Sequence, residues 1–208
     1  MMQGTLFPTP ETTLVVVALP QEIDFTFMPT IKHYLYTGVG KIEATLALTK
    51  ELALNPDITT VINYGTAGGA FDVERGHIYP ITTFMQGDYN CCLPGLDKGP
   101  VTFPAWNFKI PNKTYTCVTQ DSFVNSVQAL ELLQKQCEGW GRFNCVDMES
   151  YALATVCKHF DVDFICYKYI SDGADESAND EWHENVDGGA DQFLKLLEKH
   201  HGFRISDQ

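Results

Sequence analysis

Leu14-Val15-Val16-Val17-Ala18-Leu19 is a continuous apolar run near the start of the chain, and most of its side chains are β-branched or aliphatic. A strand that exposes one face alternates apolar and polar residues, whereas a strand buried on both faces is apolar throughout. The run therefore predicts a buried central strand. Pro20-Gln21-Glu22 ends it with a change to turn-forming and polar residues.

The rest of the chain alternates strand-like and helix-like segments. The strand-like segments are Tyr34–Thr37, Thr59–Tyr64, His77–Phe84, Tyr115–Thr119, Asn144–Val146 and Asp163–Ile170. Helical patterns run from Gly40 to the break at Asn55-Pro56, and over Phe123–Gln136, Glu149–Phe160 and Asp191–His200. Such alternation favours a mostly parallel or mixed sheet covered on both faces. We predict an α/β fold, a single domain over residues 1–208 with three layers (α/β/α) and a mixed central sheet.

Composition excludes several classes of partner. The net charge is −13 over 208 residues, which argues against binding to nucleic acid or an anionic membrane, because phosphates need a basic surface. No apolar stretch is long enough to span a bilayer, and the amino terminus has no signal-peptide pattern. The seven cysteines include no CxxC pair, so we expect reduced thiols and a cytoplasmic protein.

Metal-ligand patterns are missing from the sequence. The six histidines show neither HExxH nor a closely paired spacing, and the acidic residues 172–184 lack the alternating oxygen ligands of a calcium loop. We therefore expect no metal and no cofactor. Residues 86–113 are rich in Gly, Pro and Asn without periodicity, which predicts a long surface excursion.

Four predicted strands are followed by polar or small residues: Pro20-Gln21-Glu22, Gly65–Gly69, Val146–Glu149 and Ser171–Asp175. Taken singly, each has a structural explanation: Glu22 or Glu149 as an acid beside a helix dipole, the glycines as a tight turn, Asp172 as a helix N-cap. In open α/β sheets, however, ligands collect beyond the carboxyl ends of the strands. Carboxylates at several such ends around a glycine-rich segment together predict a functional site.

The order and content of these motifs resemble the nucleoside phosphorylase superfamily, and most of all its 5'-methylthioadenosine/S-adenosylhomocysteine nucleosidases. The matching segments are Thr37–Ala44, Val61–Gly69, Val146–Ser150 and Ile170–Asp175, within a resemblance from about Leu14 to about Trp182. The resemblance implies a purine nucleosidase that hydrolyses the N-glycosidic bond of adenine nucleosides such as 5'-methylthioadenosine and S-adenosylhomocysteine and releases adenine. It also implies a homodimer.

The same resemblance implies two catalytic acids and a ribose-binding pair. Glu22 matches the acid that orients and deprotonates the attacking water. Asp172, assisted by Ser171, matches the acid that serves the purine N7 and the exocyclic amine. Met148 and Glu149 match the pair that holds the ribose. These residue types suit the chemistry, because breaking the bond builds positive charge on the ribose and the purine leaves readily only once protonated.

The resemblance implies further substrate contacts. Phe123 and Val124 match the segment that stacks on the base and reads its edge through the backbone. Leu19 and Trp182 match apolar residues around the 5' substituent. The expected contacts also include Thr66, Ala67 and Gly68, with Thr66 in place of the more usual serine. The acidic residues 172–184 are expected to form a cap over the nucleoside, anchored by Trp182.

Two alternatives to hydrolysis stay open. A phosphorylase of this fold needs cations for its anionic nucleophile, and none of Arg75, Arg142 and Arg204 lies in a strand-end motif. A non-catalytic nucleoside-binding protein would not need the three acids that are present. Asp147 and Lys168 stand where relatives more often carry glutamate and arginine. The preferred nucleoside also stays open, with 5'-deoxyadenosine and futalosine-like compounds as further candidates.

Overall fold

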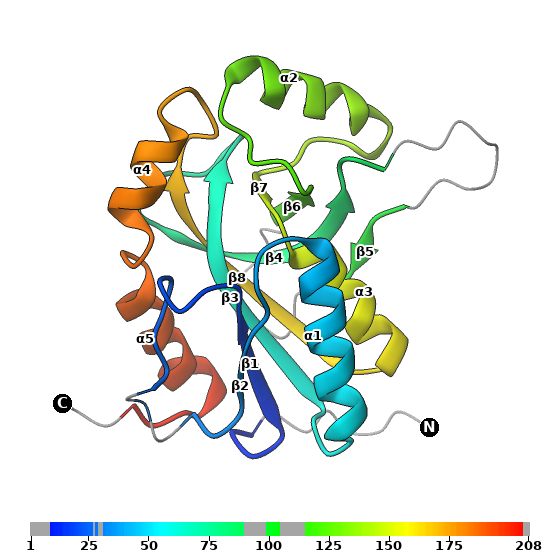
Figure 1. Cartoon of the computed structure of the whole chain (residues 1–208), viewed down its shortest axis with the longest axis vertical. Coiled ribbons are helices and arrows are strands. Elements are labelled where there is room, and N and C mark those ends of the chain that lie inside the picture. Colours follow the sequence, from blue (N-terminus) through cyan, green and yellow to red (C-terminus); the bar gives the residue numbers. More distant parts are fainter. Residues whose placement is uncertain (1–8, 27, 29–30, 90–98, 105–114, 206–208) are drawn as a thin grey trace.

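The computed structural model describes residues 9–26, 28, 31–89, 99–104 and 115–205. The strands are β1 (Thr13–Val17), β2 (Tyr34–Tyr36), β3 (Thr60–Gly69), β4 (Ile78–Gln86), β5 (Val101–Thr102), β6 (Tyr115–Thr119), β7 (Cys145–Asp147) and β8 (Asp163–Asp172). The helices are α1 (Lys41–Leu54), α2 (Val127–Gln136), α3 (Ser150–Phe160), α4 (Ala178–Asn185) and α5 (Ala190–His201), with a 3₁₀ turn at Glu138–Trp140. Figure 1 shows their arrangement.

The strands form one mixed sheet that is partly closed into a barrel. The order is β2-β1-β3-β7-β6-β4-β5, and β8 pairs with both β3 and β4. A ring of five strands results, because β3 pairs with β8, β8 with β4, β4 with β6, β6 with β7, and β7 with β3 again. The pairs β3/β7 and β4/β8 are antiparallel. Closure leaves these strands without free edges. The predicted mixed sheet is confirmed.

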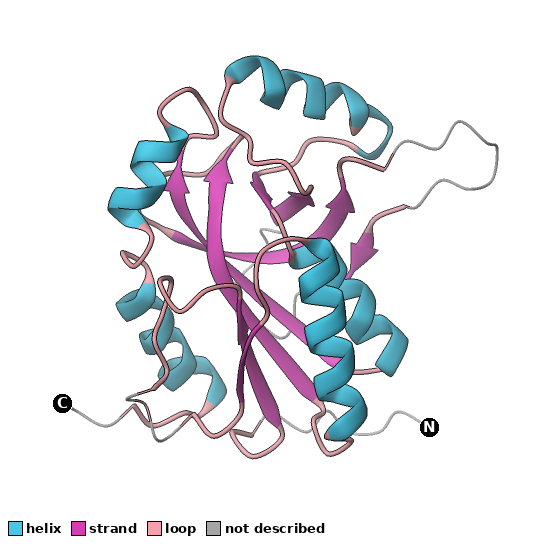
Figure 2. Ribbon diagram, viewed as in Figure 1, coloured by secondary structure: helices cyan, strands magenta, loops and turns pink. Residues whose placement is uncertain are grey.

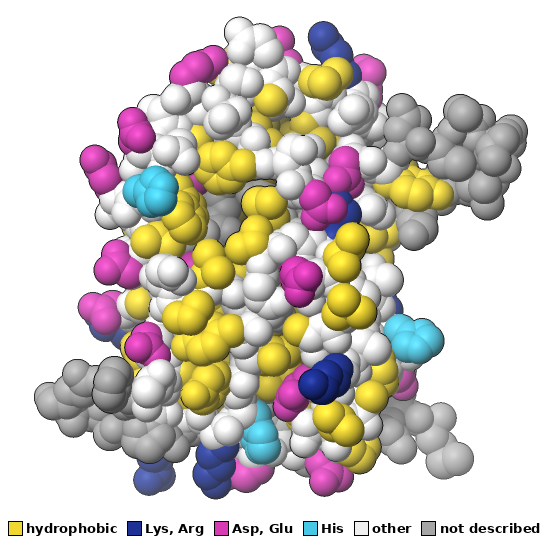
Figure 3. Space-filling view, viewed as in Figure 1, with side chains coloured by type: hydrophobic (Ala, Val, Ile, Leu, Met, Phe, Trp, Pro, Cys, Tyr) yellow, Lys and Arg dark blue, Asp and Glu magenta, His cyan; other side chains and the backbone are white. Residues whose placement is uncertain are grey.

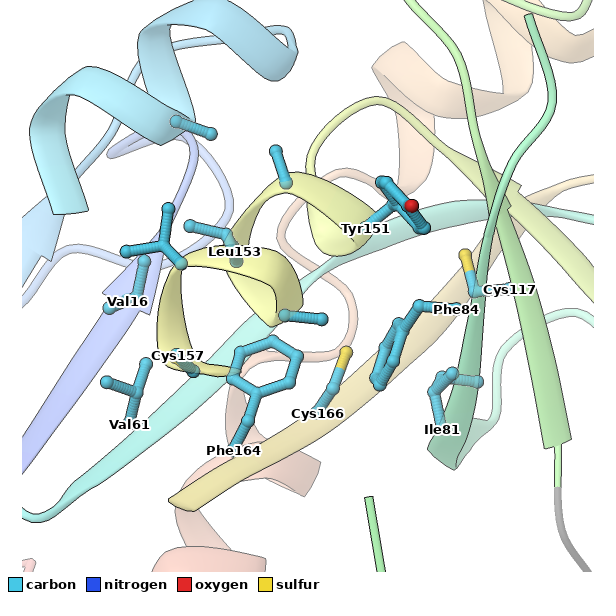
Figure 4. Close-up of a cluster of buried hydrophobic side chains, with 14 of the residues drawn as sticks. Val16, Val61, Ile81, Phe84, Cys117, Tyr151, Leu153, Cys157, Phe164 and Cys166 are labelled. Atoms are coloured by element: carbon cyan, nitrogen blue, oxygen red, sulfur yellow. The ribbon is translucent and has the colours of Figure 1, made fainter. Parts of the chain in front are cut away.

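Helices cover the sheet on both faces, as Figure 2 shows, because the central strands are apolar on both faces. On β1, Val16 packs in a cluster with residues of α1 and α3, whereas Val15 and Val17 pack in a second cluster with residues of α5. Successive side chains of a strand point to opposite faces, so an uninterrupted apolar run supplies both clusters. Figure 4 shows the first cluster, with Val16, Leu153 and Phe164 among the labelled side chains. The three-layer prediction is confirmed.

Helix α2 begins four residues later than the sequence pattern predicts. Ser126 has extended backbone dihedrals, and its hydroxyl accepts a hydrogen bond from Ala129 N at 3.2 Å. This N-cap starts the helix at Val127. Phe123 and Val124 consequently lie in the loop that precedes the helix, and Val124 packs in a third cluster with Leu133.

The expected turn at Gly65–Gly69 is the end of a strand. β3 pairs with β8 as far as Gly68 opposite Asp172, with an irregularity between Ala67 and Gly68. A Cβ atom on Gly68 would lie 2.9 Å from an oxygen of Asp172, so the glycine permits close approach and does not serve to turn the chain. β8 likewise extends two residues beyond the predicted end at Ile170.

Two segments without predicted regular structure contain elements. Within residues 86–113, Val101–Thr102 forms β5 against β4, and residues 90–98 and 105–114 lie outside the described part of the chain. The acidic segment after β8 contains helix α4. Five described cysteines are buried and free: Cys117, Cys137, Cys145, Cys157 and Cys166. Within the described ranges, no helix has the length and apolar character needed to cross a membrane.

Candidate active site

A cavity of about 260 Å³ lies where several strands of the sheet end. Every predicted site residue lines it except Ser171. The lining residues are Ala18, Leu19, Glu22, Val39, Thr66, Ala67, Gly68, Ser122, Phe123, Val124, Val146, Asp147, Met148, Glu149, Asp172, Asn179, Trp182 and His183. Figure 3 shows a hollow in this region, between α4 and α2, with a rim that is largely hydrophobic. Four segments distant in sequence therefore meet at one cavity, as the strand-end argument predicts.

Glu22 lies in the turn after β1 and is buried. Its Oε1 accepts hydrogen bonds from Thr66 N at 2.7 Å and from Thr66 Oγ1 at 2.9 Å. Its Oε2 accepts one from Leu19 N at 3.2 Å. Three donors from two segments thus fix the carboxylate at the cavity wall.

Asp172 ends β8 with its side chain buried. Ala174 N donates to Oδ1 at 2.9 Å, and the Ser171 hydroxyl donates to Oδ2 at 2.8 Å. Burial raises the pKa of Asp172 above its ordinary value, although these two hydrogen bonds oppose the shift. Ser171 does not line the cavity and acts on it through this carboxyl group. A carboxyl group with a raised pKa at a cavity wall is suited to hold and deliver a proton.

Glu149 connects the cavity to the loop before α1. Gly40 N donates to its Oε1 at 2.8 Å, and Gly40 takes a positive φ of 94°, which glycine adopts readily. Burial and the nearby Asp147 charge raise the pKa of Glu149 to about 8. The side chain therefore holds a proton near neutral pH, and positive charge on a bound ribose would favour its ionised form.

The raised pKa of Glu149 gives a pH dependence of stability. Between its ordinary pKa of 4.5 and the folded value of about 8, the folded chain holds a proton that the unfolded chain releases, so the free energy of unfolding falls as pH rises. Glu149→Gln removes this contribution. In urea unfolding across this window, we expect the wild type to lose on the order of 4 kcal/mol relative to the variant. The exposed Glu11→Gln variant should follow the wild type, and parallel wild-type and Glu149→Gln curves would contradict the assignment.

A buried ion pair includes one of the residues that line the cavity. Lys168 Nζ is 2.8 Å from Asp147 Oδ2, and both side chains are almost fully buried. Asp147 also accepts hydrogen bonds from Thr119 Oγ1 at 2.6 Å and from Ser150 N at 2.9 Å. Burial opposes ionisation of Asp147, but the Lys168 ammonium and the hydrogen bonds from Thr119 and Ser150 together keep the pKa of the carboxyl below its ordinary value. The pair fixes the end of β7, from which Met148 and Glu149 enter the cavity.

Helix α4 supplies cavity residues that the sequence reasoning missed. Asn179 and His183 line the cavity beside the predicted Trp182. Their spacing of three and four residues is that of one helix face, and it would have indicated the wall if the acidic segment had been recognised as helical. Asp147, which departs from the family pattern, also lines the cavity.

Positive charge is scarce at this cavity. No lysine or arginine is among the described residues that line it. No cluster of His, Cys, Asp or Glu suited to a metal ion occurs in the described part of the chain.

Comparisons with known proteins agree with this geometry. The model of the phosphorylase superfamily matches residues 30–200. A 5'-methylthioadenosine/S-adenosylhomocysteine nucleosidase of Baumannia cicadellinicola is 30% identical over 168 residues, which cover 72% of each chain.

Solved structures show the same fold. The MTA/SAH nucleosidase of Streptococcus pneumoniae in complex with 8-aminoadenine superposes with a TM-score of 0.76 at 16% identity, covering 89% of this chain and 96% of that one. The Neisseria meningitidis nucleosidase in complex with methylthio-immucillin-A gives a TM-score of 0.73 at 21% identity, with coverage of 89% and 96%. The chain therefore belongs to the phosphorylase superfamily, as a member similar to the 5'-methylthioadenosine/S-adenosylhomocysteine nucleosidases.

Proposed function

We propose that this protein hydrolyses the N-glycosidic bond of adenine nucleosides, among them 5'-methylthioadenosine and S-adenosylhomocysteine, and releases adenine. The observation that carries the proposal is the set of three buried carboxyl groups, Glu22, Glu149 and Asp172, around one largely apolar cavity. Hydrolysis of this bond needs a proton donor, a stabiliser of positive charge and a base for water, which three carboxyl groups can supply.

Each carboxyl group has a distinct role in the proposed reaction. Asp172 delivers a proton toward N7 of the purine, so that the base leaves as neutral adenine. Glu149 accepts hydrogen bonds from the ribose hydroxyls and stabilises the positive charge that develops on the sugar. Glu22 takes a proton from the water that attacks C1'. The new C–O bond replaces the broken C–N bond, and the charges balance with one proton gained by the purine and one lost by water.

The side chains around the three acids suit an adenine nucleoside. In this proposal Phe123 and Val124 contact the base, and Met148 contacts the ribose. Leu19 and Trp182 offer an apolar wall to the 5' substituent. Names of relatives support the substrate class: the Baumannia relative is a nucleosidase for these two compounds, and the fold neighbours bind an adenine and a methylthio analogue.

Phosphorolysis is the second candidate, and the charge of the cavity disfavours it. A phosphate nucleophile would meet buried carboxyl groups without a described lysine or arginine at the cavity wall, and such a site repels an anion. Water carries no charge and needs only a base. A non-catalytic binding protein would retain the cavity but would have no use for a buried acid with a raised pKa at the cavity wall.

The test is release of adenine from 5'-methylthioadenosine and S-adenosylhomocysteine, followed with and without phosphate. We expect release without phosphate, with free methylthioribose or ribosylhomocysteine as the second product. Release only in phosphate, with a sugar phosphate as product, would establish the phosphorylase. Binding without release from any adenine nucleoside would establish the binding protein.

We also propose a homodimer that uses the apolar surface near the cavity mouth. Val39 and Phe123 line the cavity and are 43% and 42% exposed, and Ile42 and Leu46 on α1 are 70% and 63% exposed. Side chains of this kind in water favour a covering partner. Light scattering should give twice the chain mass for the wild type and a lower mass for Ile42→Glu. A wild-type monomer would remove the proposal.

A further inference from the structure

A chain of two side-chain hydrogen bonds connects helix α4 to the proposed base. Trp182 Nε1 donates to Thr66 Oγ1 at 3.0 Å, and Thr66 Oγ1 donates to Glu22 Oε1 at 2.9 Å. Trp182 and Glu22 are far apart in sequence. The two hydrogen bonds connect three residues of the cavity wall: Trp182 on α4, Thr66 on β3 and Glu22 in the turn after β1. The resemblance to known nucleosidases assigns Trp182 only an apolar contact.

The direction of both hydrogen bonds follows from the chemistry of the groups. An indole N–H can only donate, and an ionised carboxylate can only accept. A threonine hydroxyl has one hydrogen and two lone pairs. The Trp182 N–H donates to one lone pair of the Thr66 hydroxyl oxygen, and the hydroxyl hydrogen points to Glu22. The Trp182 hydrogen bond makes the hydroxyl a stronger donor to Glu22, because hydrogen bonds in series polarise one another.

We propose that Trp182 is a positioning residue that orients the Glu22 carboxylate through the Thr66 hydroxyl. Oε1 is held by two donors of Thr66, its N–H at 2.7 Å and its hydroxyl at 2.9 Å, whereas Oε2 has the single, longer bond from Leu19 N at 3.2 Å. Oε2 therefore has the free lone pair that accepts the proton of the attacking water. The inference deepens the proposed hydrolysis and rests on it.

The placement of Trp182 is itself constrained from the other face of α4. The neighbouring Glu181 accepts a hydrogen bond from Gly173 N at 3.1 Å and pairs with Arg75. Gly173 directly follows Asp172. Glu181 thus attaches helix α4 to Gly173, next to the proposed acid, and Trp182 attaches it through Thr66 to the proposed base. The position of α4 therefore affects both catalytic groups.

Trp182→Phe separates this role from that of an apolar wall, since it keeps an aromatic ring and removes the N–H. Loss of a neutral hydrogen bond predicts a decrease in kcat of about 3- to 10-fold, with KM changed less than about 2-fold. Thr66→Val removes a bond to a charged group and should lower kcat by about 10- to 100-fold, whereas Thr66→Ser retains the hydroxyl and should stay near wild type.

The decisive measurement is the double variant Trp182→Phe/Thr66→Val. Without the hydroxyl there is nothing for the indole to orient, so Trp182→Phe should have no further effect on kcat in the Thr66→Val background. Trp140→Phe is the matched control, because Trp140 does not line the cavity, and it should leave kcat unchanged. Should Trp182→Phe fold poorly, benzothienylalanine at position 182 keeps the bicyclic ring without the N–H and gives the same test.

The positioning role would be overturned if the decreases in kcat of the two single variants multiplied in the double variant, or if Trp182→Phe changed KM alone. Trp182 would then be only an apolar wall of the cavity. Failure of the proposed function looks different, because the wild-type enzyme would then release no adenine in the absence of phosphate. The two failures are therefore distinguishable in one set of assays.

Discussion

Asp172→Asn is expected to lower kcat for adenine release by about 10³-fold, within the range for loss of a general acid. Asparagine has the shape of aspartic acid, and its amide oxygen can still accept the hydrogen bond that Ala174 N donates at 2.9 Å. It carries no transferable proton at neutral pH. The raised pKa of Asp172 places a proton on the wild-type side chain more readily than an ordinary aspartate allows, and this is the property that the substitution removes.

A change of leaving group tests that explanation. The leaving group of a nitrophenyl riboside is nitrophenolate, which departs without protonation. Asp172→Asn should therefore cleave this substrate at close to the wild-type rate while its kcat for 5'-methylthioadenosine is strongly lowered. Asp175→Asn is the matched control, because it makes the same change three residues further on. The Asp175 side chain accepts a hydrogen bond from Ser177 N and does not line the cavity. Its kcat should stay near that of the wild type. Equal losses on both substrates would indicate that Asp172 is structural.

Glu22→Gln is the second large effect, with a loss in kcat of about 10²- to 10⁴-fold. Thr66 N and Thr66 Oγ1 both donate to Oε1, so a glutamine would place its carbonyl oxygen there. Its NH₂ group then takes the position of Oε2, where it cannot accept a proton from water. Binding of the nucleoside should survive, because the ribose and base contacts proposed above come from other residues.

Calorimetric titration with a non-hydrolysable adenine nucleoside analogue should give a Kd for Glu22→Gln within about 3-fold of the wild-type value, a difference below 1 kcal/mol. Glu11→Gln, at an exposed position before β1, should alter neither Kd nor kcat. Turnover by Glu22→Gln at the wild-type rate would remove Glu22 from the role of base. Loss of binding together with turnover would assign it to substrate contact instead.

Much of the fold could be predicted because its signals are local. The apolar run of β1 predicts burial on both faces, and Val15 and Val16 indeed lie in different clusters. The boundaries failed where tertiary pairing overrode local propensity. The glycines after Tyr64 predict a turn, yet pairing with β8 keeps them in a strand. The acidic segment has no pattern from which a regular element was predicted, yet it contains α4.

The alternation of strands and helices, and the place of polar residues at strand ends, can be predicted from the sequence because they depend on periodicity and on near neighbours. Which of those residues meet depends instead on how the whole chain packs. Closure of the sheet ring buries Lys168 against Asp147, and burial raises the pKa of Glu149. The packing of α4 brings Trp182 to Thr66, 116 residues away in the chain. Contacts and pKa values of this kind arise from burial and distance between remote segments, which no local pattern records.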